Sequence, residues 1–127
     1  QANRQAVQFI VDSTRNIFKN NVLVGTVANA LLMEVDASVS ANVYANNFYA
    51  GGRIEGRMAG ASETVSATFN PNWFASFPVM LSRDPTSYFP VGSAPFKNAG
   101  PLLPDALLDR VGNERVAPVD LGPFEVP

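Results

Sequence analysis

The chain of 127 residues is long enough to form one domain that buries a core without disulfides or a metal ion. Charged residues make up only 16% of the sequence and the net charge is −2, so much of the surface must be neutral and no basic stripe is available for a phosphate backbone. Cysteine and histidine are both absent, which excludes disulfides, thiolate catalysis and every Ser/His or Cys/His catalytic arrangement. No apolar run is long enough to span a membrane as a helix.

The first segment, residues 1–21, is predicted to be a helix. Apolar side chains at Ala6, Phe9, Ile10 and Ile17 recur near helical spacing, and Asn20 marks the expected end. Residue 1 is glutamine, so we expect that something upstream was removed by processing, truncation or disorder.

Residues 31–45 carry the strongest secondary-structure signal of the chain. Apolar residues occupy the odd positions from Leu31 to Ala45, while polar residues dominate the even positions from Glu34 onward. This alternation predicts a strand of an antiparallel sheet with one covered face. Its length predicts a bulge, a bend or a projecting arm. Shorter strands are expected at 22–27 and on both sides of Gly60, where two runs are predicted to form a hairpin.

All ten prolines lie at or after Pro71. Because proline lacks the amide donor and fixes φ, this part of the chain is predicted to contribute no central strands. One short helix is expected at about 104–111, where Pro104 suits the first turn and Gly112 follows the end. We therefore predict a mainly β fold, an antiparallel sheet or sandwich with an N-terminal helix. Residues 1–82 would form this core, and residues 83–127 an extended proline-rich arm packed on the core or on a neighbouring subunit.

The proline-rich part is too apolar for a disordered tail, so its large side chains must cover another surface. The candidates for this interface are Trp73, Phe74, Phe77, Tyr88, Phe89, Phe96, Leu102, Leu103, Leu121 and Phe124.

Two patterns suggest chemistry. Glu34 and Asp36 would lie roughly 7 Å apart on one strand face, a spacing that suits glycoside hydrolysis or a hard cation such as calcium. The aromatic group around Trp73 could stack on a sugar. We favour a structural interpretation of both patterns. The two carboxylates would lie on the solvent-exposed face of a strand, and the aromatic group would anchor the arm on the core. The letters IEGR, residues 54–57, also match a protease site used in engineered linkers, although the alternating pattern on both sides favours a natural segment.

The composition resembles that of subunits of viral or phage particles: low charge, strands rich in Ala, Val, Asn and Ser, and an apolar proline-rich arm. This resemblance rests on no motif. It implies a non-enzymatic, self-associating structural subunit of a capsid, tube, spike or decoration component, located in the virion. The expected partners are copies of the chain or other particle subunits, and no nucleic acid, cofactor or metal is expected. The alternatives are a monomeric binding module for a carbohydrate or another neutral ligand, with the Trp73 cluster or the loop at Asn46 as its site, and a hydrolase that uses only carboxylates.

Overall fold

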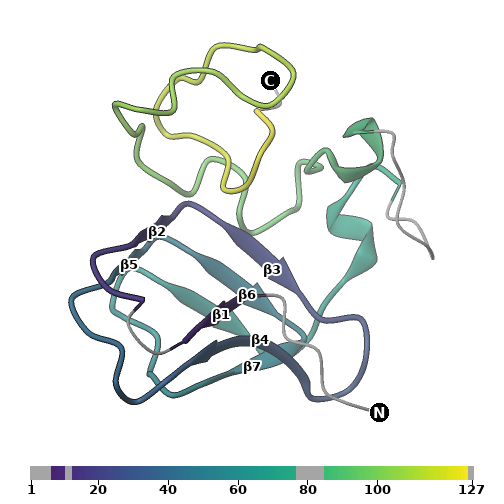
Figure 1. Cartoon of the computed structure of the whole chain (residues 1–127). Helices are drawn as coiled ribbons and strands as arrows, with labels where there is room; N and C mark the ends of the chain where they lie inside the picture. The colour runs from purple at the N-terminus through teal and green to yellow at the C-terminus, as the bar shows by residue number, and fades with distance from the viewer. Residues whose placement is uncertain (1–6, 11–12, 77–84, 126–127) are drawn as a thin grey trace. The chain divides into compact units, whose positions relative to one another are not determined.

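The structure is a computed structural model that describes residues 7–10, 13–76 and 85–125. The chain divides into two compact units, Gln1–Phe69 and Asn70–Pro127. We call the first the coiled unit and the second the loop unit, because all the named strands lie in the first (Figure 1).

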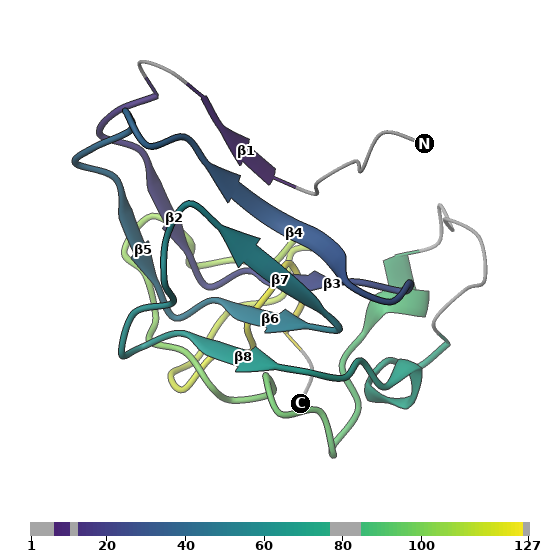
Figure 2. The same ribbon diagram turned by 90° about the horizontal axis from the view of Figure 1, so that it is seen from below.

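The coiled unit is built from short strands. They are β1 (Val7–Phe9), β2 (Ile17–Lys19), β3 (Val22–Val24), β4 (Ala30–Val35), β5 (Val43–Ala45), β6 (Phe48–Ala50), β7 (Gly52–Glu55) and β8 (Thr64–Ser66). All pairings between them are parallel, in the orders β1-β4-β7, β2-β5 and β3-β6-β8. Figure 2 shows the paired strands side by side. The first two coils have three strands each, β1 to β3 and β4 to β6, and the third coil has two, β7 and β8. Each coil stacks on the coil before it, which is the architecture of a parallel β-solenoid.

The register of the first two coils is a repeat of 26 residues. Val7 pairs with Met33, and Val22 pairs with Phe48. Asn21 meets Asn47 at the same separation of 26 residues. The backbone repeats as well: Asn20 has a φ of 56° and Asn46, one coil later, has a φ of 53°, so asparagine supplies the left-handed conformation that turns each coil.

The core lies inside the coils, where side chains from one sheet meet those of the other two. Leu23, Leu32, Met33, Val35 and Tyr49 form its buried centre. At one corner the Phe9 ring lies edge-on to the rings of Phe18 and Tyr44, with centroid distances of 6.1 and 5.4 Å. Because the same positions in successive coils point inward, the interior consists of stacked columns of apolar side chains.

The predicted N-terminal helix is wrong. The described part of residues 1–21 contains β1 and β2, and Val7 and Phe9 point inward at the two-residue spacing of a strand. The predicted helical stripe combined Phe9, which packs on the core, with Ile10 and Ile17, which are 57% and 71% exposed, so its members do not share one face. A strand of three residues is too short to display its own period.

The antiparallel sheet is also wrong, because every pairing between named strands is parallel. The expected strand 31–45 divides into β4 and β5 around a turn at Asp36, with a register irregularity between Leu31 and Met33 in the pairing of β4 with β7. The expected hairpin does not form either, since β7 and β8 belong to different sheets.

The loop unit contains two single-turn 3-10 helices in its described part, η1 (Pro71–Trp73) and η2 (Pro85–Tyr88). Isolated bridges join Phe74 to Pro90 and Gly100 to Val119. Its buried apolar residues are Ala94, Phe96, Val119, Leu121 and Phe124. The docking of residues 83–127 on a neighbouring subunit stays a prediction.

The helix predicted at about 104–111 is absent, because this segment consists of turns and a bridge between Leu108 and Glu114. Asp109 is the physical reason. Its Oδ1 accepts the backbone N–H groups of Val111 and Asn113 at 2.9 and 2.7 Å, and these bonds favour a turn over the helical pattern.

Candidate functional site

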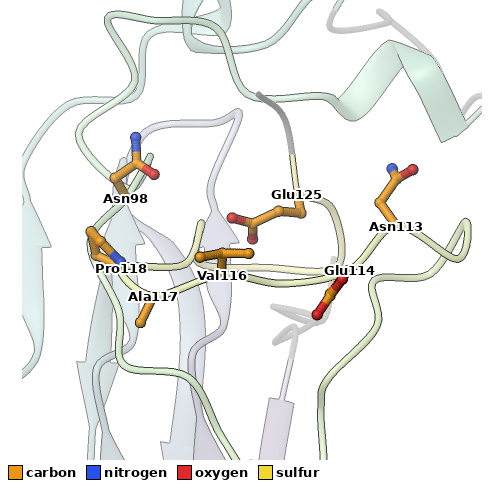
Figure 3. Close-up of a pocket in the computed structure, with 7 residues that line it drawn as sticks. All are labelled: Asn98, Asn113, Glu114, Val116, Ala117, Pro118 and Glu125. Carbon is orange, nitrogen blue, oxygen red and sulfur yellow. The ribbon is translucent and has the colours of Figure 1, made fainter.

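An open pocket of about 450 Å³ lies in the loop unit (Figure 3). Its lining residues are Asn98, Asn113, Glu114, Val116, Ala117, Pro118 and Glu125. In Figure 3, Asn98, Ala117 and Pro118 lie at one end, Asn113 and Glu114 at the other, and Val116 and Glu125 between them. Two carboxylates, two carboxamides and an apolar wall therefore surround one space.

Asp109 holds one end of the pocket in place. Besides the two N–H groups of the turn, it accepts the Asn113 side-chain amide and the Glu125 backbone N–H, both at 3.0 Å on Oδ2. Burial alone would raise the pKa of Asp109, but these bonds hold it below its ordinary value. Asp109 is thus an ionised anchor that ties the turn at Asn113 to the segment that carries Glu125.

Arg115 supports the wall from inside. Its guanidinium donates to the carbonyl oxygens of Asp120 and Gly122 at 3.0 and 2.8 Å, and it lies 3.6 Å from Glu125 Oε2. The side chain is 8% exposed and does not line the pocket. The cation is therefore used to satisfy backbone carbonyls, and the pocket itself is lined by acidic and neutral groups.

Glu125 is the most buried carboxylate of the lining, with a side chain that is 14% exposed. Burial raises its pKa, the charges of Asp120 and Asp109 add to that effect, and the Asp120 N–H and Arg115 oppose it. Asp120 N donates to Oε2 at 3.1 Å, while no hydrogen bond is formed by Oε1 within the described structure. This oxygen is free to accept a ligand donor.

The hairpin 107–116, which carries part of the pocket, also exposes large apolar side chains. They are Leu107 at 53%, Leu108 at 60%, Val111 at 45% and Val116 at 67% exposure. The backbone is fixed by a bond from Arg115 N to the Leu107 carbonyl at 2.9 Å and by the bridge at Leu108. We call these four residues the apolar surface. Large apolar side chains gathered in one short segment are typical of a protein contact site.

A second polar cluster closes the interior of the coiled unit. Glu63 Oε1 accepts Asn47 Nδ2 and the Tyr49 hydroxyl, both at 2.8 Å, and Glu63 Oε2 pairs with Arg57. Arg57 lies 4.1 Å above the Tyr44 ring. Burial alone would raise the pKa of Glu63, but the bonds from Arg57 and its other partners lower it. All these groups bond to one another, so we interpret the cluster as structural.

The aromatic interface candidates are brought together inside the loop unit. The Phe96 ring packs against Trp73 and Phe74, at centroid distances of 6.2 and 5.2 Å, and Phe89 lies 5.1 Å from Phe124. Phe96, Leu121 and Phe124 are buried, Trp73, Phe74, Tyr88, Phe89 and Leu103 are partly buried, and Leu102 is exposed. Phe77 lies outside the described residues. The surface role of this group stays a prediction.

Glu34 accepts a bond from the coil before it, and Asp36 accepts bonds from its own turn. Gln8 Nε2 donates to Glu34 at 3.1 Å, whereas Asp36, in the turn after β4, accepts the N–H and the hydroxyl of Ser38 at 2.8 and 2.6 Å. The bonds from Ser38 lower the pKa of Asp36. Asp36 lies in the turn after β4 and not on the strand that carries Glu34, and the hydrolase alternative stays a prediction.

The Asn-rich loop serves the fold. Asn47 is 1% exposed and bonds to Asn21 in the coil before it, so it is not available to a ligand. Ile54 and Glu55 of the IEGR segment lie in β7, and Arg57 joins the polar cluster. The described residues contain no group of three or more Asp, Glu, His or Cys side chains that could hold a metal ion.

Sequence reasoning missed the pocket and the apolar surface. Asn98, Glu114 and Glu125 are far apart in sequence and share no period, so only the tertiary loops bring them together. Leu107, Leu108 and Val111 would share one side of the helix predicted at about 104–111, but the helix does not form and all three are exposed. A signal for the outward orientation existed in Asp109, whose side chain favours turns.

No helix in the described part of the chain is long and apolar enough to cross a membrane. Comparison with known proteins found no matching family model, no matching curated protein and no matching solved structure.

Proposed function

We propose that the protein is a non-enzymatic, self-associating structural subunit of a viral or phage particle, such as a component of a capsid, tube, spike or decoration. The observation that carries this proposal is the apolar surface on the hairpin 107–116, where four large side chains are 45 to 67% exposed. A second copy is the partner that the low charge favours, because a net charge of −2 gives little repulsion between copies.

The magnitude of the contact can be bounded. Fully burying one such side chain contributes about 1.5 to 3 kcal/mol, so burying a half-exposed one contributes about 1 kcal/mol. A two-fold contact uses the surface of both copies and would gain roughly 8 kcal/mol from eight side chains. Association itself costs at least about 4 kcal/mol, so the surface alone supports a weak, concentration-dependent dimer. A permanent particle contact needs further area, about 800 Å² per partner.

The coil architecture suits a scaffold. Parallel stacking and the Asn21–Asn47 bonds fix each coil on its neighbour, so the unit has a regular framework held by neutral side chains. Hydrogen bonds between neutral side chains, such as those of Asn21 and Asn47, avoid the desolvation cost that a charged pair would carry when another protein covers the unit.

The test is sedimentation equilibrium or size exclusion with light scattering on the full chain over a range of concentrations. We expect an average mass above 13.6 kDa that rises with concentration. The double variant Leu107→Ser/Val111→Ser should shift the distribution to monomer. The matched control is Val27→Ser/Met58→Ser, which removes two exposed apolar side chains of the coiled unit, 68% and 90% exposed. A monomer at all concentrations, or equal effects of both double variants, would contradict the proposal.

A further inference from the structure

We infer that the pocket of the loop unit is a binding site for an alkylammonium group. Four of its lining residues present oxygen acceptors, Asn98, Asn113, Glu114 and Glu125, and its remaining lining residues, Val116, Ala117 and Pro118, are apolar. This inference does not depend on self-association.

Several acceptor oxygens of the pocket are left without a hydrogen bond by the described fold, although Glu125 Oε2 accepts the Asp120 N–H. Glu114 has no side-chain hydrogen bond or ion pair within the described structure, and Glu125 keeps Oε1 without a hydrogen bond. The Asn113 amide nitrogen donates to Asp109, which leaves its carbonyl oxygen for a ligand. An ammonium group donates three hydrogen bonds and accepts none, so it complements a lining of free acceptors.

Charge favours a cation over a neutral polar ligand. The lining holds two carboxylates and no lysine or arginine among the described residues. The nearest buried cation, Arg115, donates to the carbonyl oxygens of Asp120 and Gly122 and forms an ion pair with Glu125 Oε2 at 3.6 Å, so it offsets part of the charge of Glu125 and none of Oε1's hydrogen-bonding capacity. Asp109 and Asp120 add negative charge behind the wall, which explains in part why the pKa of Glu125 is raised. A bound cation would relieve this repulsion between carboxylates.

Shape and the limited number of carboxylates favour an organic cation over a metal ion. The described residues offer no cluster of three metal-ligating side chains, and a small ion leaves most of a 450 Å³ pocket unfilled. The wall of Val116, Ala117 and Pro118 can cover the methylene stem of an amine, as apolar surface covers lysine stems in folded proteins. The chemistry is shared by a free alkylamine or polyamine and by a lysine side chain.

The test is titration of the isotope-labelled full chain, monitored by NMR through the side-chain amides of Asn98 and Asn113. The probes are butylammonium, the neutral butanol of the same length, and N-acetyl-lysine methylamide. We expect saturable shifts with both amines and none with butanol. Tighter binding of the lysine derivative would identify a protein side chain as the source, and tighter binding of butylammonium a free amine. Equal shifts with butanol, or no saturable shift with either amine, would overturn the inference.

Two variants test the acceptors. Glu125→Gln should weaken butylammonium binding about tenfold, the value of one lost charge-assisted bond. Because Glu125 also bonds to Asp120, Glu114→Gln provides a second variant whose carboxylate has no hydrogen bond in the described fold, and it should weaken binding in the same direction. The control is Glu55→Gln, an exposed carboxylate of β7, which should leave the affinity unchanged. Unchanged affinity in both Glu114→Gln and Glu125→Gln would contradict a carboxylate site.

Discussion

Replacing Asn47 by alanine is expected to destabilise the coiled unit more than any exposed polar substitution. Its side chain is 1% exposed and forms four hydrogen bonds that join three coils. Oδ1 accepts both the backbone N–H and the side-chain amide of Asn21 at 3.0 Å, and Nδ2 donates to the carbonyl of Phe18 at 2.9 Å and to Glu63 at 2.8 Å.

The magnitude follows from the groups left behind. The Asn21 N–H and the Phe18 carbonyl lose their side-chain partner in a partly buried position, and each such loss costs about 1 to 3 kcal/mol. Glu63 keeps Tyr49 and Arg57, so it adds little. We expect a loss of about 3 kcal/mol, a large part of a total stability of about 5 to 15 kcal/mol. For a unit of this size the unfolding temperature should fall by roughly 10 to 20 °C.

The assay is urea unfolding followed by circular dichroism at the strand band, in which the midpoint should fall with an unchanged m-value. Asn42→Ala is the matched control. Asn42 also receives two exposed bonds from an asparagine one coil earlier, Asn16, and its Nδ2 donates to the Ser13 carbonyl and the Tyr44 hydroxyl. Asn42 is only partly buried, so water can replace these bonds more easily than those of Asn47. The control should lose about 1 kcal/mol or less. Equal losses in the two variants, or an Asn47→Ala loss below about 1 kcal/mol, would refute the reasoning.

Two further predictions concern the last coil. Burial alone would raise the pKa of Glu63, but Arg57 and the other partners of this carboxylate lower it. The stabilisation by ionised Glu63 is therefore fully present above the unfolded pKa of about 4.3, and it is lost as the pH falls through the lower folded pKa. Urea midpoints measured down to about pH 3 should therefore fall more steeply with pH in the wild type than in Glu63→Gln. If the midpoints of the two proteins fell in parallel, ionised Glu63 would not stabilise the fold. Gly56→Ala should cost about 3 kcal/mol or more, because Gly56 has a φ of +81° and an added Cβ would overlap the Val35 carbonyl. Gly60→Ala places its Cβ 3.6 Å from the nearest heavy atom and should change the midpoint little; similar losses in both glycine variants would argue against steric overlap.

The alternation of apolar and polar residues located β4 but could not give the direction of its partners. Met33 and Val35 point into the core and Glu34 lies between them at higher exposure, as the pattern predicts. The same alternation occurs in an antiparallel sheet and in the wall of a solenoid, because in both cases one face is covered. Whether a strand pairs in parallel or antiparallel with its neighbours depends on residues far away in sequence. The alternation within one strand carries no information about them.

The sequence does contain a signal that separates the two folds. The pattern of Asn16, Asn20, Asn21 and Gly25 recurs 26 residues later, and the apolar residues between these positions recur in kind. Such a repeat indicates stacked coils. Only two copies of the repeat are complete. In the third coil Glu63 occupies the place next to Asn47, and it follows Asn47 by only 16 residues instead of 26. A repeat that occurs twice and then changes length is hard to detect in a single sequence.

The change at the third coil has a physical explanation. An asparagine side chain both accepts and donates, so it can pass a ladder of bonds from one coil to the next. The donors run in one direction, from Asn21 to Asn47 and from Asn47 to Glu63. An ionised glutamate only accepts, so it receives the last donor and cannot extend the ladder. Its remaining acceptor capacity is filled within its own coil by Arg57 and by the Gly60 N–H at 2.9 Å. The residue that ends the ladder therefore also fixes the short segment that closes the core.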